Sequence, residues 1–126
     1  MPRSFISKDE LDARVLYVLM MHQGAQNAID RWQLVEQVFG ERQFSQNDDN
    51  VLDRRLRQSI ERMRHDGHMI CNSGDGNGYF IAGTVEEYQQ FRNIYGAHAF
   101  PIMEAIREMD KAAAQKWENP LQPRMI

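Results

Sequence analysis

Two stretches of the chain contain residue types that could do chemistry, and the first is rich in glycine. Residues 70–83 read ICNSGDGNGYFIAG, in which Gly74, Gly76 and Gly78 alternate with polar residues. A phosphate-binding loop follows a strand and opens into a helix whose first amide groups bind the anion. Here an apolar run of strand formers comes next, with no lysine, serine or threonine directly after the last of these glycines. Because glycine, aspartate and asparagine tolerate the positive φ of tight turns, we predict a β-hairpin and not a catalytic loop.

The second stretch is rich in arginine. Five arginines lie in residues 54–64, and arginine suits contacts with phosphate and guanine better than lysine does. An apolar stripe at helical spacing predicts a helix with one buried side, formed by Leu52, Leu56, Ile60 and Met63. Acidic residues cancel the arginines, so residues 48–66 carry no net charge. Two interpretations stay open: a surface that contacts nucleic acid, and a solvated or protein-binding surface with ion pairs such as Glu61 with Arg57.

A third pattern involves metal-ligating residues. His65, His68 and Cys71 recur every three residues, but the first ends a predicted helix and the second begins a predicted strand. Their side chains need not converge, and a fourth ligand is missing. A lone strand cysteine is usually a small core residue, and no nucleophile elbow, dinucleotide fingerprint or kinase signature occurs. We therefore expect no metal, no cofactor and no enzymatic activity.

Capping signals and periodicity predict the elements that must position these residues. Ser7 with Glu10, and Thr84 with Glu87, fit the capping box that opens a helix. In chain order we expect a helix at about 8–23, an optional short strand within 25–29, a helix between Asp30 and Gly40, a loop at 41–50, a helix at about 50–66, strands at 68–72 and 79–82, and a helix at 84–117.

This order of elements, together with one motif, resembles a known family. Ile60, Met63-Arg64, Gly67, Ile70 and Gly78-Tyr79 occupy the places of an isoleucine, a Leu-Arg pair, a glycine, a strand and a Gly-Tyr pair in biotin-repressor-like winged-helix domains. Small phage and prophage winged-helix proteins are similar too. The resemblance implies a winged helix-turn-helix fold in which the third helix recognises DNA and the hairpin forms the wing.

The DNA-contacting residues expected on this basis lie in the third helix, at the start of the second helix and in the hairpin turn. They are Arg31, Arg54, Arg55, Arg57, Gln58, Arg62 and Asn77. Two features favour a protein partner instead. The hairpin has no lysine or arginine between Cys71 and Gly83, although phosphate contacts usually use one, and the third helix has an acidic start. Its anchors would then include aromatic residues such as Tyr79, Phe80, Tyr88 and Tyr95.

Residues 84–117 carry apolar side chains at spacings of three and four, close to a coiled-coil seam. A single helix of this length would extend about 50 Å, further than a small domain can cover. We expect it either to bend near Gly96 and Pro101 or to pair with a second copy. The residues predicted to form the homodimer interface are Tyr95, Ala99, Ile102, Ile106 and Met109.

Composition limits the partners and the cellular compartment that we expect for the chain. The net charge of −3 gives no overall attraction to nucleic acid, so any affinity must come from a local patch. Cys71 is alone, which excludes an internal disulfide and indicates a cytoplasmic protein. No apolar run approaches the roughly 20 residues of a membrane span, and the N-terminus lacks the features of a signal peptide.

The sequence therefore predicts an α+β fold, mainly α with a small β-hairpin. We expect a winged-helix domain at 1–83, a long helix at 84–117 that is kinked near 96–101, and an irregular tail at 118–126. The favoured function is non-enzymatic binding of duplex DNA by a homodimer, in transcriptional regulation or in phage or plasmid DNA metabolism. The alternative is a winged-helix protein–protein adaptor in a replication or host-takeover assembly, without direct DNA binding.

Overall fold

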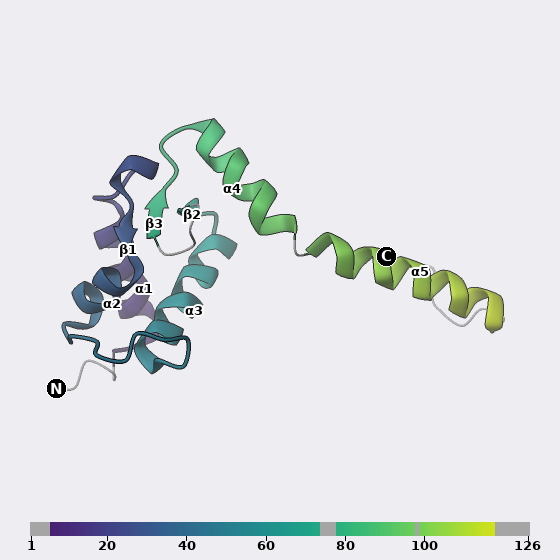
Figure 1. Cartoon of the computed structure of the whole chain (residues 1–126), viewed down its shortest axis with the longest axis horizontal. Helices are drawn as coiled ribbons and strands as arrows, with labels where there is room; N and C mark the ends of the chain where they lie inside the picture. Colours follow the sequence, from purple (N-terminus) through teal and green to yellow (C-terminus); the bar gives the residue numbers. More distant parts are fainter. Residues whose placement is uncertain (1–5, 74–77, 98, 118–126) are drawn as a thin grey trace. The chain divides into compact units, whose positions relative to one another are not determined.

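The computed structural model describes residues 6–73, 78–97 and 99–117 of the chain, with the backbone alone at 99–102 and 104–106. Most of these residues are helical, and a small antiparallel sheet of three strands completes an α+β fold (Figure 1). The elements are α1 (Lys8–Leu19), η2 (Ala25–Asn27), β1 (Ile29–Asp30), α2 (Arg31–Phe39), α3 (Val51–His65), β2 (Ile70–Asn72), β3 (Gly78–Ile81), α4 (Val85–Ala97) and α5 (Ala99–Lys116). The chain divides into two compact units, Met1–Phe91 and Arg92–Ile126.

Side-chain caps determine where the first three helices begin. Ser7 accepts a hydrogen bond from the Glu10 amide, and Asp30 accepts from the amides of Trp32 and Gln33. Asn50 caps α3 by accepting from the Asp53 amide at 2.9 Å. Each cap satisfies an amide group that has no partner within its own helix. The predicted starts of these helices are confirmed.

The end of α1 differs from the prediction. The helix stops at Leu19, four residues before the expected end at residue 23. The segment that follows pairs with the sheet, because Ile81 donates its amide to the His22 carbonyl at 2.9 Å and Gly24 donates to the Ile81 carbonyl at 2.8 Å. These backbone bonds to β3 replace the last turn of the helix.

The glycine-rich segment joins two strands, as predicted. β2 and β3 are antiparallel, with Cys71 opposite Phe80, and the optional strand β1 pairs with the other edge of β3. At the base of the hairpin, Ser73 donates its amide to the Gly78 carbonyl at 2.8 Å. A Cβ atom on Gly78 would lie 2.9 Å from the Ser73 hydroxyl, so the close approach of the strands requires glycine here. The turn residues 74–77, including Asn77, lie outside the described residues.

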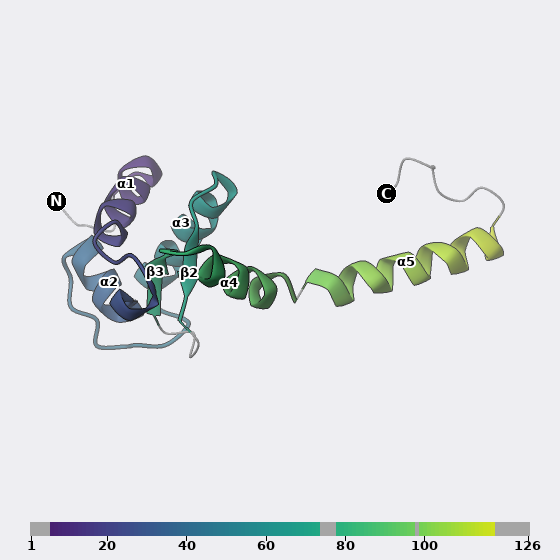
Figure 2. The same ribbon diagram turned by 90° about the horizontal axis from the view of Figure 1, so that it is seen from above.

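The core of the first unit lies among α1, α2, α3 and the sheet (Figure 2). α1 packs against both α2 and α3. The predicted apolar stripe of α3 is confirmed, because Leu52, Leu56, Ile60 and Met63 are all buried. Burial of this stripe determines which side of α3 faces solvent, and therefore which of its charged residues are available to a ligand.

The C-terminal segment contains two helices, α4 and α5, and residue 98 between them lies outside the described residues. α4 ends at Ala97 and α5 begins at Ala99, within the range where a kink was expected. Pro101 stands at the third position of α5, where its missing amide removes no intrahelical bond.

Candidate nucleic-acid interface

The exposed side of α3 borders a shallow surface depression, which we call the cationic hollow. It is lined by Lys8, Arg54, Arg57, Gln58, Glu61 and Arg62. Four of these six residues are cations, and Glu61 is the one carboxylate among them. Glu61 accepts a hydrogen bond from Arg64 at 2.9 Å, which offsets its charge. A locally positive surface therefore exists on a chain whose net charge is −3.

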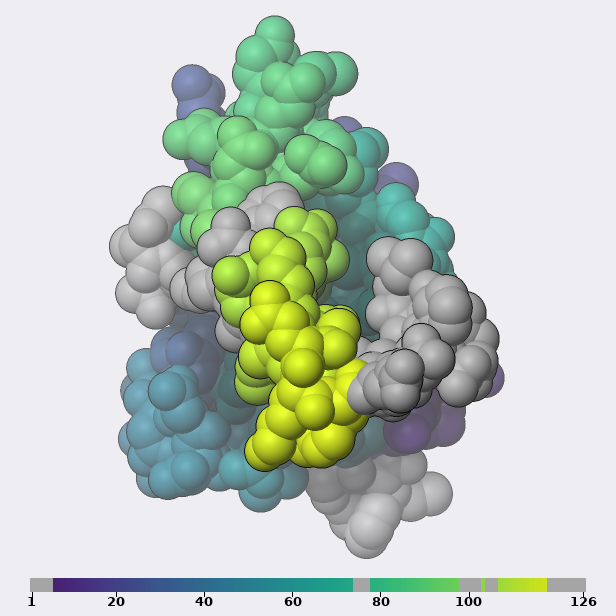
Figure 3. Space-filling view, turned by 90° about the vertical axis from the view of Figure 1, so that its right-hand side faces the viewer, coloured from purple at the N-terminus to yellow at the C-terminus, as the bar shows by residue number. Residues whose placement is uncertain are grey.

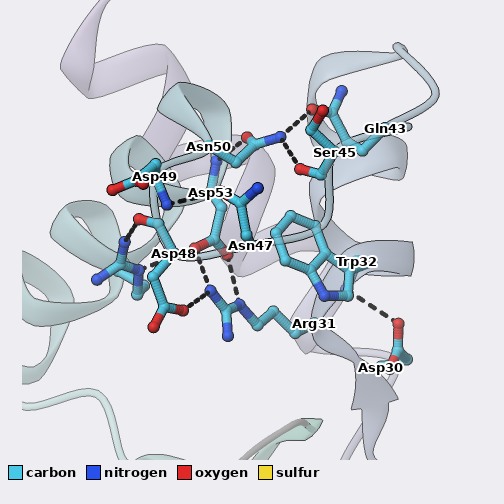
Figure 4. Close-up of polar contacts among 11 residues, drawn as sticks. Asp30, Arg31, Trp32, Gln43, Ser45, Asn47, Asp48, Asp49, Asn50 and Asp53 are labelled. Carbon is cyan, nitrogen blue, oxygen red and sulfur yellow. Dashed lines mark hydrogen bonds and ion pairs between the residues drawn. The ribbon is translucent and has the colours of Figure 1, made fainter.

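A buried carboxylate holds the arginines at one end of α3 (Figure 4). Asp53 is fully buried and accepts from Arg31 Nε at 2.7 Å and Nη2 at 2.5 Å. It also accepts from Arg57 Nε at 2.9 Å. Asp48 lies in the loop before α3 and accepts from Arg31 at 2.9 Å. We call Arg31, Asp48, Asp53 and Arg57 the Asp53 network.

The Asp53 network explains both the acidic start of α3 and the position of the long loop. An ionised carboxylate without partners is very unfavourable in a protein interior, whereas two guanidinium groups satisfy this one. The hydrogen bond to Asp53 is the main cause that raises the pKa of Arg31, and the hydrogen bond from Arg31 lowers the pKa of Asp48. The side chain of Arg31 is only 15% exposed and does not line the cationic hollow.

A second carboxylate holds the other end of the cationic hollow. Asp12 of α1 accepts from Arg62 Nη2 at 2.7 Å and Nε at 3.1 Å, and from the Ser59 hydroxyl at 2.5 Å. We call these three residues the Asp12 cluster. Burial alone would raise the pKa of Asp12, but the hydrogen bonds from Arg62 and Ser59 outweigh it and lower the pKa. The Asp12 cluster thus connects α1 to α3 and keeps the carboxylate ionised.

The remaining predicted DNA contacts divide into two groups. Arg54 and Gln58 line the cationic hollow, and both are exposed to solvent. Arg55 does not line it. Its Nη2 donates to the Ile6 carbonyl at 2.5 Å, and its guanidinium lies 5.5 Å from the centre of the Phe39 ring. The structure therefore brings together Arg54, Arg57, Gln58 and Arg62, but not Arg31 or Arg55.

Sequence reasoning missed two residues of this region and assigned one ion pair wrongly. Lys8 and Asp12 come from α1, far from α3 in the chain, and no local pattern connects them with Arg62. The ion pair of Arg57 was assigned to the wrong partner: the structure pairs it with Asp53, and pairs Glu61 with Arg64. The spacing of Asp53 and Arg57 at i and i+4 is a signal that could have identified that pair.

The expected partner-binding residues are distributed over the core and the C-terminal helices. Tyr79 and Phe80 are buried at 6% and 5% exposure, so the expectation that they anchor a protein partner is wrong. The side chains of Tyr95 in α4 and Met109 in α5 are 45% and 62% exposed. Figure 3 draws the side of the chain on which the described atoms near the end of α5 appear in yellow. Ala99, Ile102 and Ile106 belong to α5, but their side chains lie outside the described residues.

The described part of the chain contains neither a cluster of metal ligands nor a membrane span. Within residues 6–73, 78–97 and 99–117, no three histidine, cysteine or acidic residues gather as a metal site, and Cys71 is buried. In the same ranges no helix is both long and apolar enough to cross a bilayer. No protein-family model, curated protein or solved structure matches the chain.

Proposed function

We propose that the chain is a non-enzymatic DNA-binding protein of the winged-helix type, in which α3 contacts duplex DNA through the cationic hollow. The observation that carries this proposal is the composition of that hollow, with four cations, one amide and one paired carboxylate beside a solvent-facing helix. Contacts with phosphate supply most of the non-specific affinity of DNA-binding proteins. A local cationic surface can supply them despite the negative net charge.

The topology supports the winged-helix part of the proposal. A short strand, β1, lies between α1 and α2, and a hairpin follows α3. The sheet order β1-β3-β2 places that first strand beside the hairpin. The resemblance around Ile60, Gly67 and Gly78-Tyr79 points to the same arrangement. In such an arrangement the third helix is the element that enters the major groove.

The exposed residues of α3 suit two kinds of contact. Arg54 and Gln58 are the residues of α3 in the cationic hollow that are exposed. Arginine can donate two hydrogen bonds to guanine, and glutamine can form two with adenine. Lys8, Arg57 and Arg62 lie around them and suit the phosphates on either side of the groove. We assign base contacts to Arg54 and Gln58, and phosphate contacts to the three surrounding cations.

We propose that two copies pair through α5. Its 18 residues place Ile102, Ile106, Met109 and Ala113 at helical spacing along one side. Met109 is 62% exposed within its own chain. A dimer would present two α3 helices to two half-sites. Both transcriptional regulation and phage or plasmid DNA metabolism use binders of this kind.

Sedimentation of the full chain tests the pairing. The Met109→Glu variant should dissociate to a monomer, because a charge would then lie in the apolar seam. The Arg107→Ala variant changes the opposite side of the same helix and should leave the dimer intact. A monomeric wild type at tens of micromolar would remove the homodimer from the proposal.

One observation favours the adaptor alternative. A second depression lies between α1 and α2, and its lining includes Ala13, Tyr17, Val18, Met21 and Val38. Tyr17 and Met21 are 72% and 63% exposed. Exposed apolar side chains that cluster around a depression are typical of protein-binding surfaces. In this alternative the α1–α2 depression binds a protein and the cationic hollow is a solvated surface.

A salt titration of binding to duplex DNA separates the two functions. If Lys8, Arg57 and Arg62 each neutralise one phosphate, the logarithm of the affinity should fall with the logarithm of salt concentration with a slope of about −2.7. Undetectable binding to duplex DNA at low salt would overturn the DNA-binding proposal. A protein partner that remains bound after nuclease treatment would then support the adaptor.

A further inference from the structure

Arg62 is held in place more firmly than a surface arginine usually is. Two of its donor atoms, Nε and Nη2, bind the two carboxylate oxygens of Asp12, and Ser59 fixes that carboxylate from the other side. Ser59 is fully buried, and the Asp12 side chain is only 25% exposed. Arg62 Nη1 forms no hydrogen bond with any described residue. The Asp12 cluster thus fixes one edge of the guanidinium and leaves another edge available at the cationic hollow.

A guanidinium that is already fixed is an efficient phosphate ligand. A free arginine side chain loses much conformational entropy when a ligand immobilises it, whereas Arg62 loses that entropy when the protein folds. Preorganisation of this kind increases affinity without adding any new contact. The geometry of Arg57 is similar, because Nε binds Asp53 and Nη2 donates to the Asp48 carbonyl at 3.1 Å.

Simple charge counting gives the opposite expectation for Asp12. Its carboxylate lies next to a surface that should attract phosphate, so by its charge alone it would repel the DNA. That repulsion acts within a screening length of about 8 Å at physiological salt. Removal of the negative charge would then strengthen binding. The two effects of Asp12, repulsion and positioning, therefore predict changes of opposite sign.

We propose that Asp12 and Ser59 are positioning residues, which orient Arg62 so that its Nη1 edge binds a phosphodiester of the DNA backbone. The inference rests on the proposed DNA-binding function and deepens it, because it names the chemical group that Arg62 binds and the residues that prepare it. Asp12 touches no DNA in this account. It increases affinity although it has the same sign of charge as the ligand.

The Asp12→Asn variant tests the sign of the effect, with binding to a duplex measured by fluorescence anisotropy over a range of salt concentrations. Asparagine has a similar size but binds a guanidinium weakly, so we expect a loss of affinity of roughly three- to tenfold. Asp9→Asn is the matched control. Asp9 lies on the same helix and acts on Arg62 only through its charge, so its loss should leave binding unchanged or make it slightly tighter.

A double-mutant cycle assigns the effect to Arg62. The Arg62→Ala variant should weaken binding and reduce the magnitude of the salt slope by about 0.9, the contribution of one phosphate contact. In that background Asp12→Asn should cause no further loss, because there is no longer a guanidinium to orient. An equal loss with and without Arg62 would show that Asp12 acts on binding by another route, and would overturn the positioning role.

Each remaining result decides between the two proposals. Tighter binding by Asp12→Asn, comparable to that of Asp9→Asn, would leave DNA binding intact and overturn the positioning role. A wild type that binds no duplex at low salt would overturn the function itself. If circular dichroism shows that Asp12→Asn is unfolded, Ser59→Ala replaces it. This variant keeps both charges and should weaken binding by about two- to threefold, whereas unchanged binding would contradict the positioning role.

Discussion

The Asp53 network and the Asp12 cluster use the same pair of chemical groups in two different ways. In the first, a carboxylate with no exposure is shared by Arg31 and Arg57. In the second, a carboxylate that is 25% exposed binds one arginine along its edge. Arg31 uses Nε and Nη2 for Asp53 and Asp48, and its side chain is only 15% exposed, whereas that of Arg62 is 33% exposed. Arg62 keeps one donor available at the surface.

The difference shows that exposure of the ion pair determines whether its arginine can also bind a ligand. A buried carboxylate needs partners within the protein. Of its two arginines, the 15% exposed Arg31 is part of the fold, whereas the 42% exposed Arg57 also lines the cationic hollow. A carboxylate near the surface is hydrated in part and needs fewer donors, so its arginine can bind a ligand as well. Predictions that change one carboxylate at a time can test this relation between exposure and role.

The largest effect should come from Asp53→Asn. The change leaves the guanidinium of Arg31, which is 15% exposed, without its buried ionised partner and with only the exposed Asp48. Removal of one partner of a buried ion pair usually destabilises a protein by about 3–5 kcal/mol. We expect a loss of that size in the free energy of unfolding, measured by urea denaturation. Asp49→Asn, which removes an exposed charge from the same loop, should change stability by less than about 0.5 kcal/mol.

An equal result for the two variants would contradict the assignment of Asp53 to the fold. Such a result would mean that Arg31 is adequately solvated without its partner. DNA binding offers an independent measurement. Because Arg31 does not line the cationic hollow, Arg31→Met should leave the salt slope of binding unchanged once the variant is folded.

A smaller loss should follow from Asp12→Asn. The Asp12 cluster connects α1 and α3, but its ion pair is partly hydrated, since the side chains of Arg62 and Asp12 are 33% and 25% exposed. Hydrogen bonds to charged groups contribute about 1.5–3 kcal/mol when buried, and hydration reduces that value. We expect a loss of about 1 kcal/mol in urea denaturation. A loss as large as that of Asp53→Asn would contradict the difference between the two sites.

The sequence predicted most of the fold because the relevant signals are local. Caps such as Asp30, the apolar stripe of α3 and the turn chemistry around Gly78 each act over a few residues. The predicted end of α1 was wrong because the residues after Leu19 pair with the edge of β3. That strand lies about 60 residues further along the chain. The end of α4 at Ala97 lies in the range where a kink was expected. A proline signals a helix boundary without showing whether the helix bends or restarts.

The candidate site was less accessible to such reasoning. The sequence identifies the arginines of α3, but their partners determine which of them remain available. Arg55 is directed to the Ile6 carbonyl and the Phe39 ring, and Arg31 to Asp53, through contacts that depend on tertiary packing. The count of charges in residues 48–66 had treated the acids only as groups that cancel the charge of the arginines. In the structure one of these acids, Asp53, holds Arg57, and Asp12 of α1, outside the counted stretch, holds Arg62.

The stability of the chain should fall at acid pH, and Asp12 should contribute to that fall. Its pKa in the folded protein lies below the usual value of 3.8. A lowered pKa stabilises the fold above the unfolded value, and this contribution disappears as the pH falls through the folded value. The stability difference between wild type and Asp12→Asn should therefore be constant from about pH 5 to 7. It should decrease as the pH falls below about 4. Urea midpoints measured across this range check it.

The smallest effect should come from Asp48→Asn. Asp48 binds the same arginine as Asp53, but its side chain is 86% exposed, and exposed ion pairs contribute little because water and salt screen them. Its lowered pKa reflects the hydrogen bond from Arg31, not burial. We expect a smaller shift of the urea midpoint than for Asp12→Asn, and one that disappears in about 1 M salt, where the screening length is about 3 Å. The shift of Asp53→Asn should persist there, since ions do not screen a carboxylate that solvent cannot reach. If both shifts disappeared in salt, exposure would not be the property that separates the role of Asp53 from that of Asp48.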